Sequence, residues 1–306
     1  MPNFEHRTYG TNVATVTQLW QSYPDLKPYY PFAWENEFDG DYFAKSMWDN
    51  QHLVYLLVGV YICLVFMVKA DKAKFCFVTK KVNPKTGKEE RVTPGWLRHS
   101  FGMWNLGLSL FSHWGMARTV PQLLYYLNNW TLKEAICTPP TLSFGHGACG
   151  LWAQAFIVSK IPELFDTMFL ALKGVNLDLL QWYHHSTVLA FCWHSYVNES
   201  AYGLWFIAMN YTVHAIMYMY FALMNYKLFT GFLKTVAPLL TFMQISQMVV
   251  GTFVVFKAIM LKREDPSCAI EDSNLVFGGI IYFSYLCLFV QFAINKYGPK
   301  PKGKTA

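Results

Sequence analysis

Seven apolar runs, separated by short polar segments, dominate the chain after residue 48. Each run is close to the ~20 residues that cross the hydrocarbon core of a bilayer as an α-helix. The runs cover residues 51–68, 101–127, 148–172, 179–197, 203–223, 236–260 and 275–294. This pattern predicts an all-α membrane protein with seven transmembrane helices.

The basic residues are distributed unequally between the two sides that seven spans would create. Of the 25 Lys and Arg residues, 16 fall on the side that holds the loop 69–98 and the C-terminus, and seven fall on the other side. Basic residues are enriched in cytosolic loops. The pattern therefore predicts a lumenal or extracellular N-terminus and a cytosolic C-terminus.

The same pattern divides the chain into three regions. Residues 1–48 form a lumenal or interfacial segment, residues 49–297 the seven-helix domain, and residues 298–306 a Lys-rich cytosolic tail. The aromatic stretch 29–34 is expected to anchor the first region at the headgroup level. The chain does not begin with a charged segment followed by an apolar one, so we expect no cleaved signal peptide.

Composition agrees with a bilayer as the solvent. Only 14% of the residues are charged and 54% are hydrophobic, against about 25% charged in a typical soluble domain. The net charge of +6 comes from segments that flank apolar runs, so we do not interpret it as a nucleic-acid-binding surface.

Polar and ionisable side chains interrupt three consecutive apolar runs. Such side chains are costly in hydrocarbon and mark a functional site by default. The fourth and fifth runs are joined by a short loop and should be antiparallel neighbours. We therefore predict one active site, built from Lys160, Glu163, Asp166 and Thr167 in the third run, His184 and His185 in the fourth, and Asn210 and His214 in the fifth.

Structural explanations compete with this one for some of these residues. On a helix, Lys160, Glu163 and Thr167 share one face, and an ion pair that joins two helices would explain Glu163 and Asp166 equally well. A single membrane histidine more often packs or forms a hydrogen bond, but three histidines beside an amide, two carboxylates and a lysine favour chemistry.

Two further patterns in the sequence concern polar and metal-binding side chains. Thr241, Gln244 and Gln247 fall at i, i+3 and i+6 of the sixth run, where amides bridge helices or line a polar cavity. A di-iron centre of the desaturase type requires several histidine clusters, whereas one His-His pair and no HxxxH spacing occur here. We therefore expect no metal site.

These residues resemble the motifs of the ELO family of fatty acid elongases. Residues 160–167 match KxxExxDT, and Asn210 to Tyr220 match NxxxHxxMYxY through Asn210, His214, Met217, Tyr218 and Tyr220. Thr241, Gln244 and Gln247 match TxxQxxQ, and Gln181 to His185 stand where the family has HxxHH. The sequence around Trp182–Leu189 and Trp205–Tyr211 is most similar to the branch that acts on saturated and monounsaturated chains.

The resemblance implies a fold and a reaction. The fold is seven helices, six of which form a closed bundle around an acyl tunnel. The reaction condenses a long-chain acyl-CoA with malonyl-CoA, releases carbon dioxide and CoA, and yields a 3-oxoacyl-CoA two carbons longer. It requires no dissociable cofactor. The implied partners are membrane lipid and the reductases and dehydratase of the elongation cycle, and a homodimer is allowed.

The resemblance also implies roles for individual residues. His184 is expected to carry the acyl group as an acyl-imidazole, with His185, His214, Asn210 and Gln181 completing the catalytic group. The expected substrate-binding residues are Lys160, Glu163, Asp166, Thr167, Tyr218, Gln244 and Gln247. Two positions depart from the family pattern: Gln181 replaces the first histidine of the box and cannot titrate, and Phe221 replaces a common tyrosine.

A non-enzymatic seven-helix lipid receptor or transporter would share the span number and the orientation. It explains less well why the polar residues gather in the third, fourth and fifth runs.

The remaining expectations concern a disulfide and the location of the protein in the cell. Cys137 and Cys268 fall in two lumenal loops and should form a disulfide, with Cys149 as the alternative partner. Lys302 and Lys304 resemble an endoplasmic-reticulum retrieval signal, so we expect the membrane of that organelle.

Overall fold

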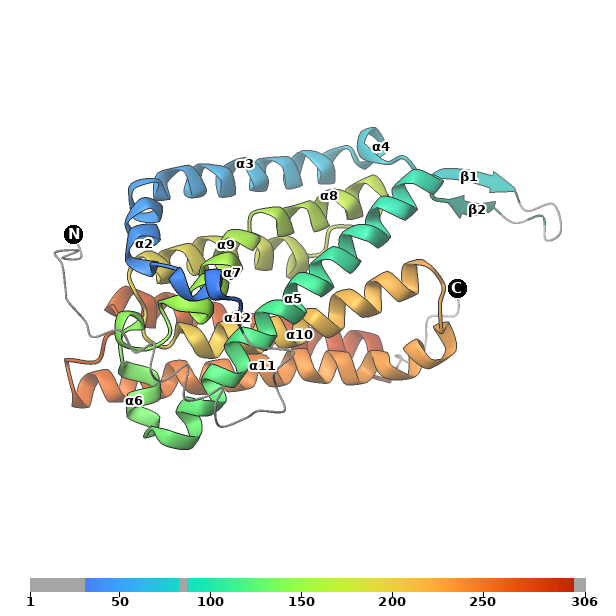
Figure 1. Ribbon diagram of the computed structural model, residues 1–306. Coiled ribbons are helices and arrows are strands. Elements are labelled where there is room, and N and C mark those ends of the chain that lie inside the picture. Colours follow the sequence, from blue (N-terminus) through green and yellow to red (C-terminus); the bar gives the residue numbers. More distant parts are fainter. Residues whose placement is uncertain (1–30, 83–86, 88, 300–306) are drawn as a thin grey trace.

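The computed structural model describes residues 31–82, 87 and 89–299, and helices make up most of it (Figure 1). The tail lysines and the aromatic residues 29 and 30 lie outside the described residues. The elements, in chain order, are η2 (Ala33–Glu37), α2 (Gly40–Asp49), α3 (Gln51–Ala70), α4 (Lys72–Phe75), β1 (Thr79–Val82), β2 (Glu89–Val92), α5 (Gly95–Asn129), α6 (Leu132–Cys137), η3 (Pro140–Leu142), α7 (Gly147–Ser159), η4 (Pro162–Leu164), α8 (Phe165–Leu172), α9 (Leu179–Val197), α10 (Gly203–Asn225), α11 (Thr230–Glu264) and α12 (Asp272–Tyr297).

Four of these helices are both long enough and apolar enough to cross a membrane. They are α3, α10, α11 and α12, with 20, 23, 35 and 26 residues. Their mean hydropathy and their helical form agree with an all-α membrane protein. The two short strands β1 and β2 pair antiparallel, with Thr79 opposite Val92, and project from one end of the molecule (Figure 1).

The third apolar run does not form the continuous helix that a single span would require. It divides into α7, the 3-10 turn η4 and α8. Pro162 has no backbone N–H to continue the helix, and the amides of Lys160 and Ile161 bond to carbonyls three residues back, at 3.2 and 3.1 Å. The expectation that Lys160, Glu163 and Thr167 share one helix face is therefore wrong in detail.

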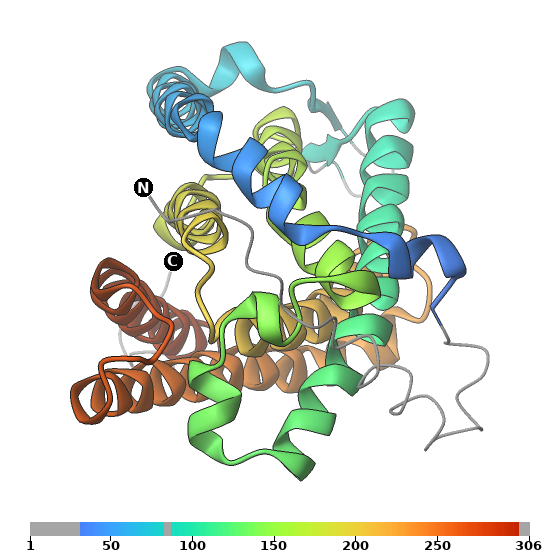
Figure 2. The same ribbon diagram turned by 60° about the vertical axis from the view of Figure 1, so that its left-hand side comes forward.

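Helix α10 packs against α5 and α11 near the centre of the molecule (Figure 2). Two glycines of α5 make the close approach to α10 and its C-cap possible. A Cβ at Gly115 would overlap the ring of Tyr211, and a Cβ at Gly102 would overlap the ring of Tyr226. Small residues at a helix contact allow the backbones to come together in this way.

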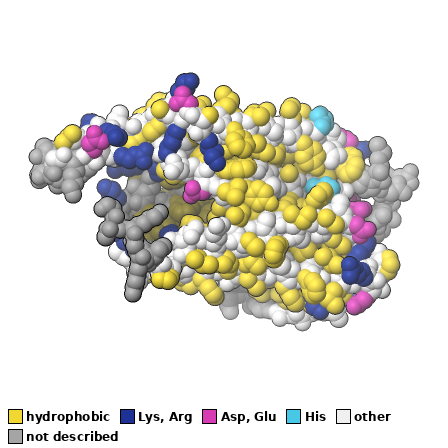
Figure 3. Space-filling view, turned by 180° about the vertical axis from the view of Figure 1, so that it is seen from behind, with side chains coloured by type: hydrophobic (Ala, Val, Ile, Leu, Met, Phe, Trp, Pro, Cys, Tyr) yellow, Lys and Arg dark blue, Asp and Glu magenta, His cyan; other side chains and the backbone are white. Residues whose placement is uncertain are grey.

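The outer helices turn apolar side chains outward. In the most apolar 18-residue stretch of each helix, only 17% of α3 and 22% of α12 are buried inside the protein. Large side chains such as Leu56, Phe66 and Phe283 are more than half exposed, and apolar atoms cover the middle of the face in Figure 3. An apolar surface of this extent is expected where lipid is the solvent.

The N-terminal segment penetrates the protein more deeply than an interfacial anchor would. Glu35 is 1% exposed, and Arg118 of α5 donates to its carboxylate from Nε and Nη2, at 2.9 to 3.2 Å. Trp152 of α7 donates to the same carboxylate at 2.6 Å. A buried charge is tolerated when it is paired and hydrogen-bonded, so this contact fixes the segment against α5 and α7.

A disulfide joins Cys137, at the end of α6, to Cys268 in the loop before α12, as the sequence predicts. The same two segments are held by an ion pair between Lys133 and Asp265 at 2.7 Å. The bond from Lys133 keeps the pKa of the Asp265 carboxyl well below its usual range. Cys149 is a buried free thiol, so the alternative pairing is not formed.

We predict that breaking this disulfide lowers the thermal stability of the protein. The bridge closes a sequence separation of 131 residues, and removal of such a bond costs roughly 2–5 kcal/mol. The paired variant Cys137→Ser with Cys268→Ser should therefore melt at a lower temperature in detergent. The variant Cys63→Ser, which removes an exposed free thiol, serves as the control. An unchanged melting temperature in the paired variant would contradict the prediction.

Candidate active site

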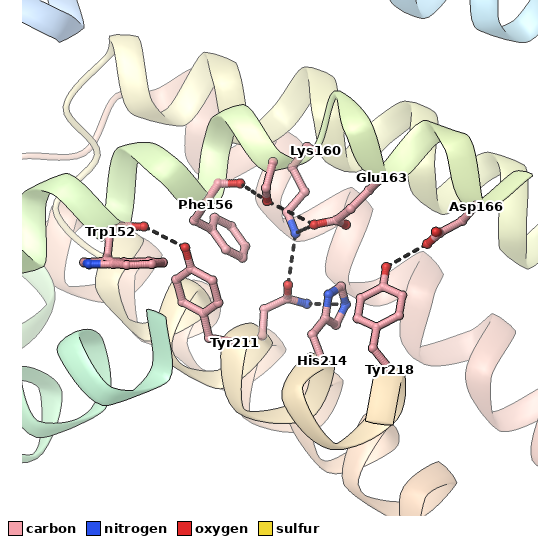
Figure 4. A network of polar contacts seen from close by, with 10 residues as sticks. Trp152, Phe156, Lys160, Glu163, Asp166, Tyr211, His214 and Tyr218 are labelled. Carbon is pink, nitrogen blue, oxygen red and sulfur yellow. Dashed lines mark hydrogen bonds and ion pairs between the residues drawn. The ribbon is translucent and has the colours of Figure 1, made fainter. Parts of the chain in front are cut away.

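A chain of polar contacts links η4 to the middle of α10 (Figure 4). Lys160 Nζ donates to Glu163 Oε1 at 2.7 Å and to Asn210 Oδ1 at 3.2 Å. Asn210 Nδ2 lies 3.2 Å from His214 Nε2, where the amide donates to the ring nitrogen. The Lys160 ammonium is therefore coupled to the imidazole of His214 through a single side-chain amide.

The ion pair lies at the turn that begins at Pro162. The Lys160 and Glu163 side chains are 2% and 3% exposed, and a lysine buried among apolar side chains must be neutralised by a partner. Ser159 Oγ also donates to Glu163 Oε1, at 3.1 Å. The Lys160 ammonium lies 4.0 Å from the centroid of the Phe156 ring, which adds a cation–π contact.

Asp166 is held by two hydrogen bonds from two different helices. Trp104 Nε1 of α5 donates to Oδ1 at 2.6 Å, and the Tyr218 hydroxyl of α10 donates to Oδ2 at 2.7 Å. The ring of Tyr218 also meets the ring of His214 edge to face, with centroids 5.2 Å apart. Asp166 thus joins α8 to α5 and α10 and sets the position of the aromatic side chain next to His214.

The two adjacent histidines lie in the second turn of α9. Their ring centroids are 5.6 Å apart, and the ring of Tyr285 from α12 lies 4.7 Å from that of His184. Among the described residues, no hydrogen-bond partner lies within reach of the buried Nδ1 atoms of His184 and His185, or of Glu163 Oε2. An unpaired buried polar atom costs roughly 1–3 kcal/mol, which a bound polar ligand would recover.

A cavity connects this group to the end of the molecule that carries α2. It measures about 1000 Å³, counting the open space that it includes, and most of its lining is apolar. His184, Asn210 and Gln247 lie on its wall, together with apolar side chains of α7, α9, α10 and α12 such as Phe156 and Ile207. A mostly apolar cavity with an imidazole on its wall suits an acyl chain with its reactive carbonyl at that histidine.

The structure brings together some of the predicted residues and separates others. His184, Asn210 and Gln247 line the cavity, and His214, Lys160 and Glu163 connect to it through Asn210. Thr167 instead lies 2.8 Å from the Tyr61 hydroxyl of α3, and Thr241 contacts the Tyr297 hydroxyl at 3.3 Å.

Two predicted amides are placed differently from each other. Gln244 Nε2 donates to the Met217 sulfur at 3.3 Å, whereas Gln247 is buried and lines the cavity. Gln181 lies in the first turn of α9 and is half-buried. Gln244 and Gln247 therefore have different surroundings although they belong to one motif.

Sequence reasoning did not identify Trp104, Tyr61 or Tyr285. Each is an aromatic residue in an apolar run that contains many others, so composition gives no signal for it. In the fold, the indole of Trp104 donates to Asp166 and the hydroxyl of Tyr61 contacts Thr167. The hydroxyl of Tyr285 donates to the backbone carbonyl of His184 at 3.3 Å. Only these tertiary contacts distinguish the three residues from the other aromatic residues.

Among the described residues, no group of three or more His, Cys, Asp or Glu side chains is arranged to hold a metal ion. The chemistry available at the site is that of imidazoles, a lysine, an amide and two carboxylates. Such groups support nucleophilic and general acid–base catalysis.

Comparisons with known proteins identify the family of the chain. The profile of the GNS1/SUR4 family (ELO) matches residues 46–305. The chain is 37% identical over 284 residues to fatty acid elongase 2 of Trypanosoma cruzi (strain CL Brener), covering 90% of this chain and 96% of that protein. It is 41% identical over 215 residues to fatty acid elongase 1 of Trypanosoma brucei brucei (strain 927/4 GUTat10.1), covering 68% and 69%.

A third relative comes from an animal. The chain is 32% identical over 273 residues to very long chain fatty acid elongase 6 of Drosophila melanogaster, covering 88% of this chain and 79% of that protein. The family profile spans more than half of the chain, and these relatives match most of it. The chain therefore belongs to the ELO (GNS1/SUR4) family of fatty acid elongases.

Proposed function

We propose that this elongase condenses a long-chain acyl-CoA with malonyl-CoA through an acyl-imidazole on His184. The observation that carries the proposal is the apolar cavity with His184 on its wall and no hydrogen-bond partner at its Nδ1 among the described residues. The receptor or transporter alternative does not account for a reactive group at this place. The cavity shields the thioester from water and holds the chain by apolar burial.

The reaction proceeds in two halves. In the first, a ring nitrogen of His184 attacks the acyl carbonyl carbon, the carbon–sulfur bond breaks, and CoA leaves with the proton that the imidazole gives up. In the second, malonyl-CoA loses carbon dioxide and its enolate carbon attacks the acyl-imidazole. The carbon–nitrogen bond breaks and the departing ring nitrogen takes up a proton, which restores His184 and releases the 3-oxoacyl-CoA. Covalent catalysis of this kind predicts ping-pong kinetics.

The other polar residues of the site serve the second half. His185 and His214 stabilise the malonyl carboxylate or the enolate, and Asn210 orients His214 through the 3.2 Å contact. Lys160, fixed by Glu163, supplies a positive charge one amide away from His214. Gln181 forms a hydrogen bond to the thioester or to the imidazole, a task that needs no titration.

We also propose seven membrane-spanning segments, with α7, η4 and α8 together forming the third. Segments two to seven form a closed bundle around the cavity, a proposal supported by the lining residues from α7, α9, α10, α11 and α12. The substrates are saturated and monounsaturated chains, and the product passes to the reductases and dehydratase of the elongation cycle. No dissociable cofactor takes part.

The first prediction on mechanism concerns His184. His184→Ala should abolish CoA release from acyl-CoA in the absence of malonyl-CoA, by at least about a thousandfold, as expected for loss of a covalent nucleophile. Wild-type protein treated with acyl-CoA alone should gain the mass of one acyl group, mapped to His184 by peptide mass spectrometry. His185→Ala and His214→Ala should retain part of this first half-reaction while losing condensation.

Matched variants separate these roles. His113 is an exposed histidine of α5 whose Nδ1 lies 2.8 Å from the Ser109 carbonyl, so His113→Ala should leave both half-reactions unchanged. Gln181→His should retain activity, whereas Gln181→Leu should lose much of it. A fully active His184→Ala enzyme would exclude the covalent route.

We further predict that chain length is set at the end of the cavity remote from His184. The thioester must sit at the reacting groups, so the methyl end measures length. Ala44 of α2 is 5% exposed and lines the cavity there. Ala44→Leu should shorten the longest product, measured by mass spectrometry of products from a mixture of acyl-CoAs.

Ser46→Leu places the same side chain on the exposed face of α2 and is the control for Ala44→Leu. It should leave product length unchanged. If only changes beside His184 altered product length, the length-determining site would have to lie at the reacting end.

Finally, we propose that the protein resides in the endoplasmic reticulum membrane with its N-terminus in the lumen and its C-terminus in the cytosol. The disulfide supports this orientation because its two loops would face an oxidising compartment. Most of the Lys and Arg side chains visible in Figure 3 lie at the opposite end, around the β hairpin. In sealed microsomes, protease should remove a C-terminal tag and spare an N-terminal one. The reverse pattern would invert the topology.

A further inference from the structure

The end of the cavity remote from His184 is lined by polar side chains. Beside apolar residues such as Ala44 and Phe144, acidic, hydroxyl and phenol residues of α2, η3, the end of α9 and the turn after it line this end. These lining residues are Asp41, Thr141, Ser195, Tyr196, Glu199 and Ser200. A terminal methyl group could form no hydrogen bond with these side chains.

Several polar atoms at this end lack a hydrogen-bond partner among the described residues. They are the buried Thr141 Oγ1 and Ser200 Oγ on the cavity wall, and Asn274 Nδ2 behind it. Ser200 is 4% exposed and Asn274 is fully buried. Asn274 Oδ1 already accepts from Ser195 at 2.8 Å, which leaves its amide nitrogen as an unused donor. Unpaired buried polar groups cost free energy, and a ligand with a hydroxyl would recover it.

The spacing places these groups where the end of an acyl chain would lie. His184 and Val197 are thirteen residues apart on α9, which is about 20 Å of helix. A chain of sixteen carbons spans roughly two thirds of the ~30 Å hydrocarbon core, which is the same length. A chain bound with its carbonyl at His184 therefore brings its terminal carbon to Ser200 and Thr141.

We propose that this end of the cavity is a binding site for a terminal hydroxyl group, so that the enzyme also elongates ω-hydroxyacyl-CoA. The inference rests on the proposed function, because it takes the cavity to be the acyl site. The hydroxyl bonds with Ser200, Thr141 and the polar groups beside them and takes no part in the reaction. The bonds made and broken are those of the ordinary condensation, and the product is an ω-hydroxy-3-oxoacyl-CoA.

The charges at this end determine which terminal group is accepted. Asp41 and Glu199 are both lining residues, so a chain that ends in a carboxylate meets like charge at this end and is disfavoured. A hydroxyl can donate to these carboxylates as well as to the neutral oxygens. The site therefore discriminates between two polar chain ends of similar size.

The experiment compares three substrates with the full-length protein in detergent micelles. Palmitoyl-CoA, ω-hydroxypalmitoyl-CoA and the corresponding ω-carboxyl thioester are each supplied with malonyl-CoA, and kcat/KM is measured from product formation. Hydroxyl-terminated chains two and four carbons shorter are included, since the terminal group must reach the polar lining. We expect the best ω-hydroxy substrate to be used within about tenfold of palmitoyl-CoA, and the ω-carboxyl substrate to be at least about a hundredfold poorer.

Variants test whether the hydroxyl binds where we propose. Ser200→Ala and Thr141→Val each remove one hydroxyl with little change in shape. Each should lower the ratio of kcat/KM for the ω-hydroxy substrate to that for palmitoyl-CoA by roughly three- to tenfold, the value of one hydrogen bond. Ser46→Ala, on the exposed face of α2, should leave this ratio unchanged.

The possible outcomes separate this inference from the proposed function. If palmitoyl-CoA is elongated and every ω-hydroxy chain is rejected as strongly as the ω-carboxyl chain, the inference is wrong and the proposed function stands. If the ratio is unchanged in both Ser200→Ala and Thr141→Val, buried water and not substrate satisfies these hydroxyls, and the inference is again wrong. Failure with palmitoyl-CoA and with all other acyl-CoAs would instead contradict the proposed function.

Discussion

The candidate active site depends on the buried ion pair between Lys160 and Glu163, which lies where the helix breaks at Pro162. An unpaired ammonium would be too costly to desolvate at this depth, so Lys160 needs a carboxylate partner. Across the 3-10 turn, Nζ and Oε1 are 2.7 Å apart. The second donor contact of Lys160, to Asn210, then fixes the position of His214 on a different helix.

The residues around this pair divide into those that meet the cavity and those that hold helices together. Asp166 accepts from Trp104 and Tyr218, and Thr167 meets Tyr61, so both tie α8 to neighbouring helices. His184 and Asn210 face the cavity itself. Rigid support of this kind is what positions a reactive imidazole against a substrate, since small displacements there reduce the rate strongly.

The two ends of the cavity carry polar residues of different kinds. One end carries the imidazole and amide groups that suit acyl transfer, and the remote end carries hydroxyl and acidic residues. Helix α2 contributes to the wall at this remote end, and the contact of Glu35 with Arg118 and Trp152 anchors the segment that precedes it. Residues of the N-terminal segment, which the sequence assigns to the membrane interface, are therefore part of the cavity wall.

The sequence by itself determined the helical membrane class, the family, the disulfide pair and most residues of the polar network. It could do so because burial of His184, Lys160 and Asn210 in apolar runs is visible as an exception to the local pattern, and because the motif spacings are specific. Only the tertiary structure decided that the third run is broken, that Thr167 and Thr241 face other helices, and that Trp104 and Tyr285 support the site. Those outcomes depend on contacts between segments far apart in the chain. The sequence around an aromatic residue in an apolar run does not indicate which side chain it contacts in the fold.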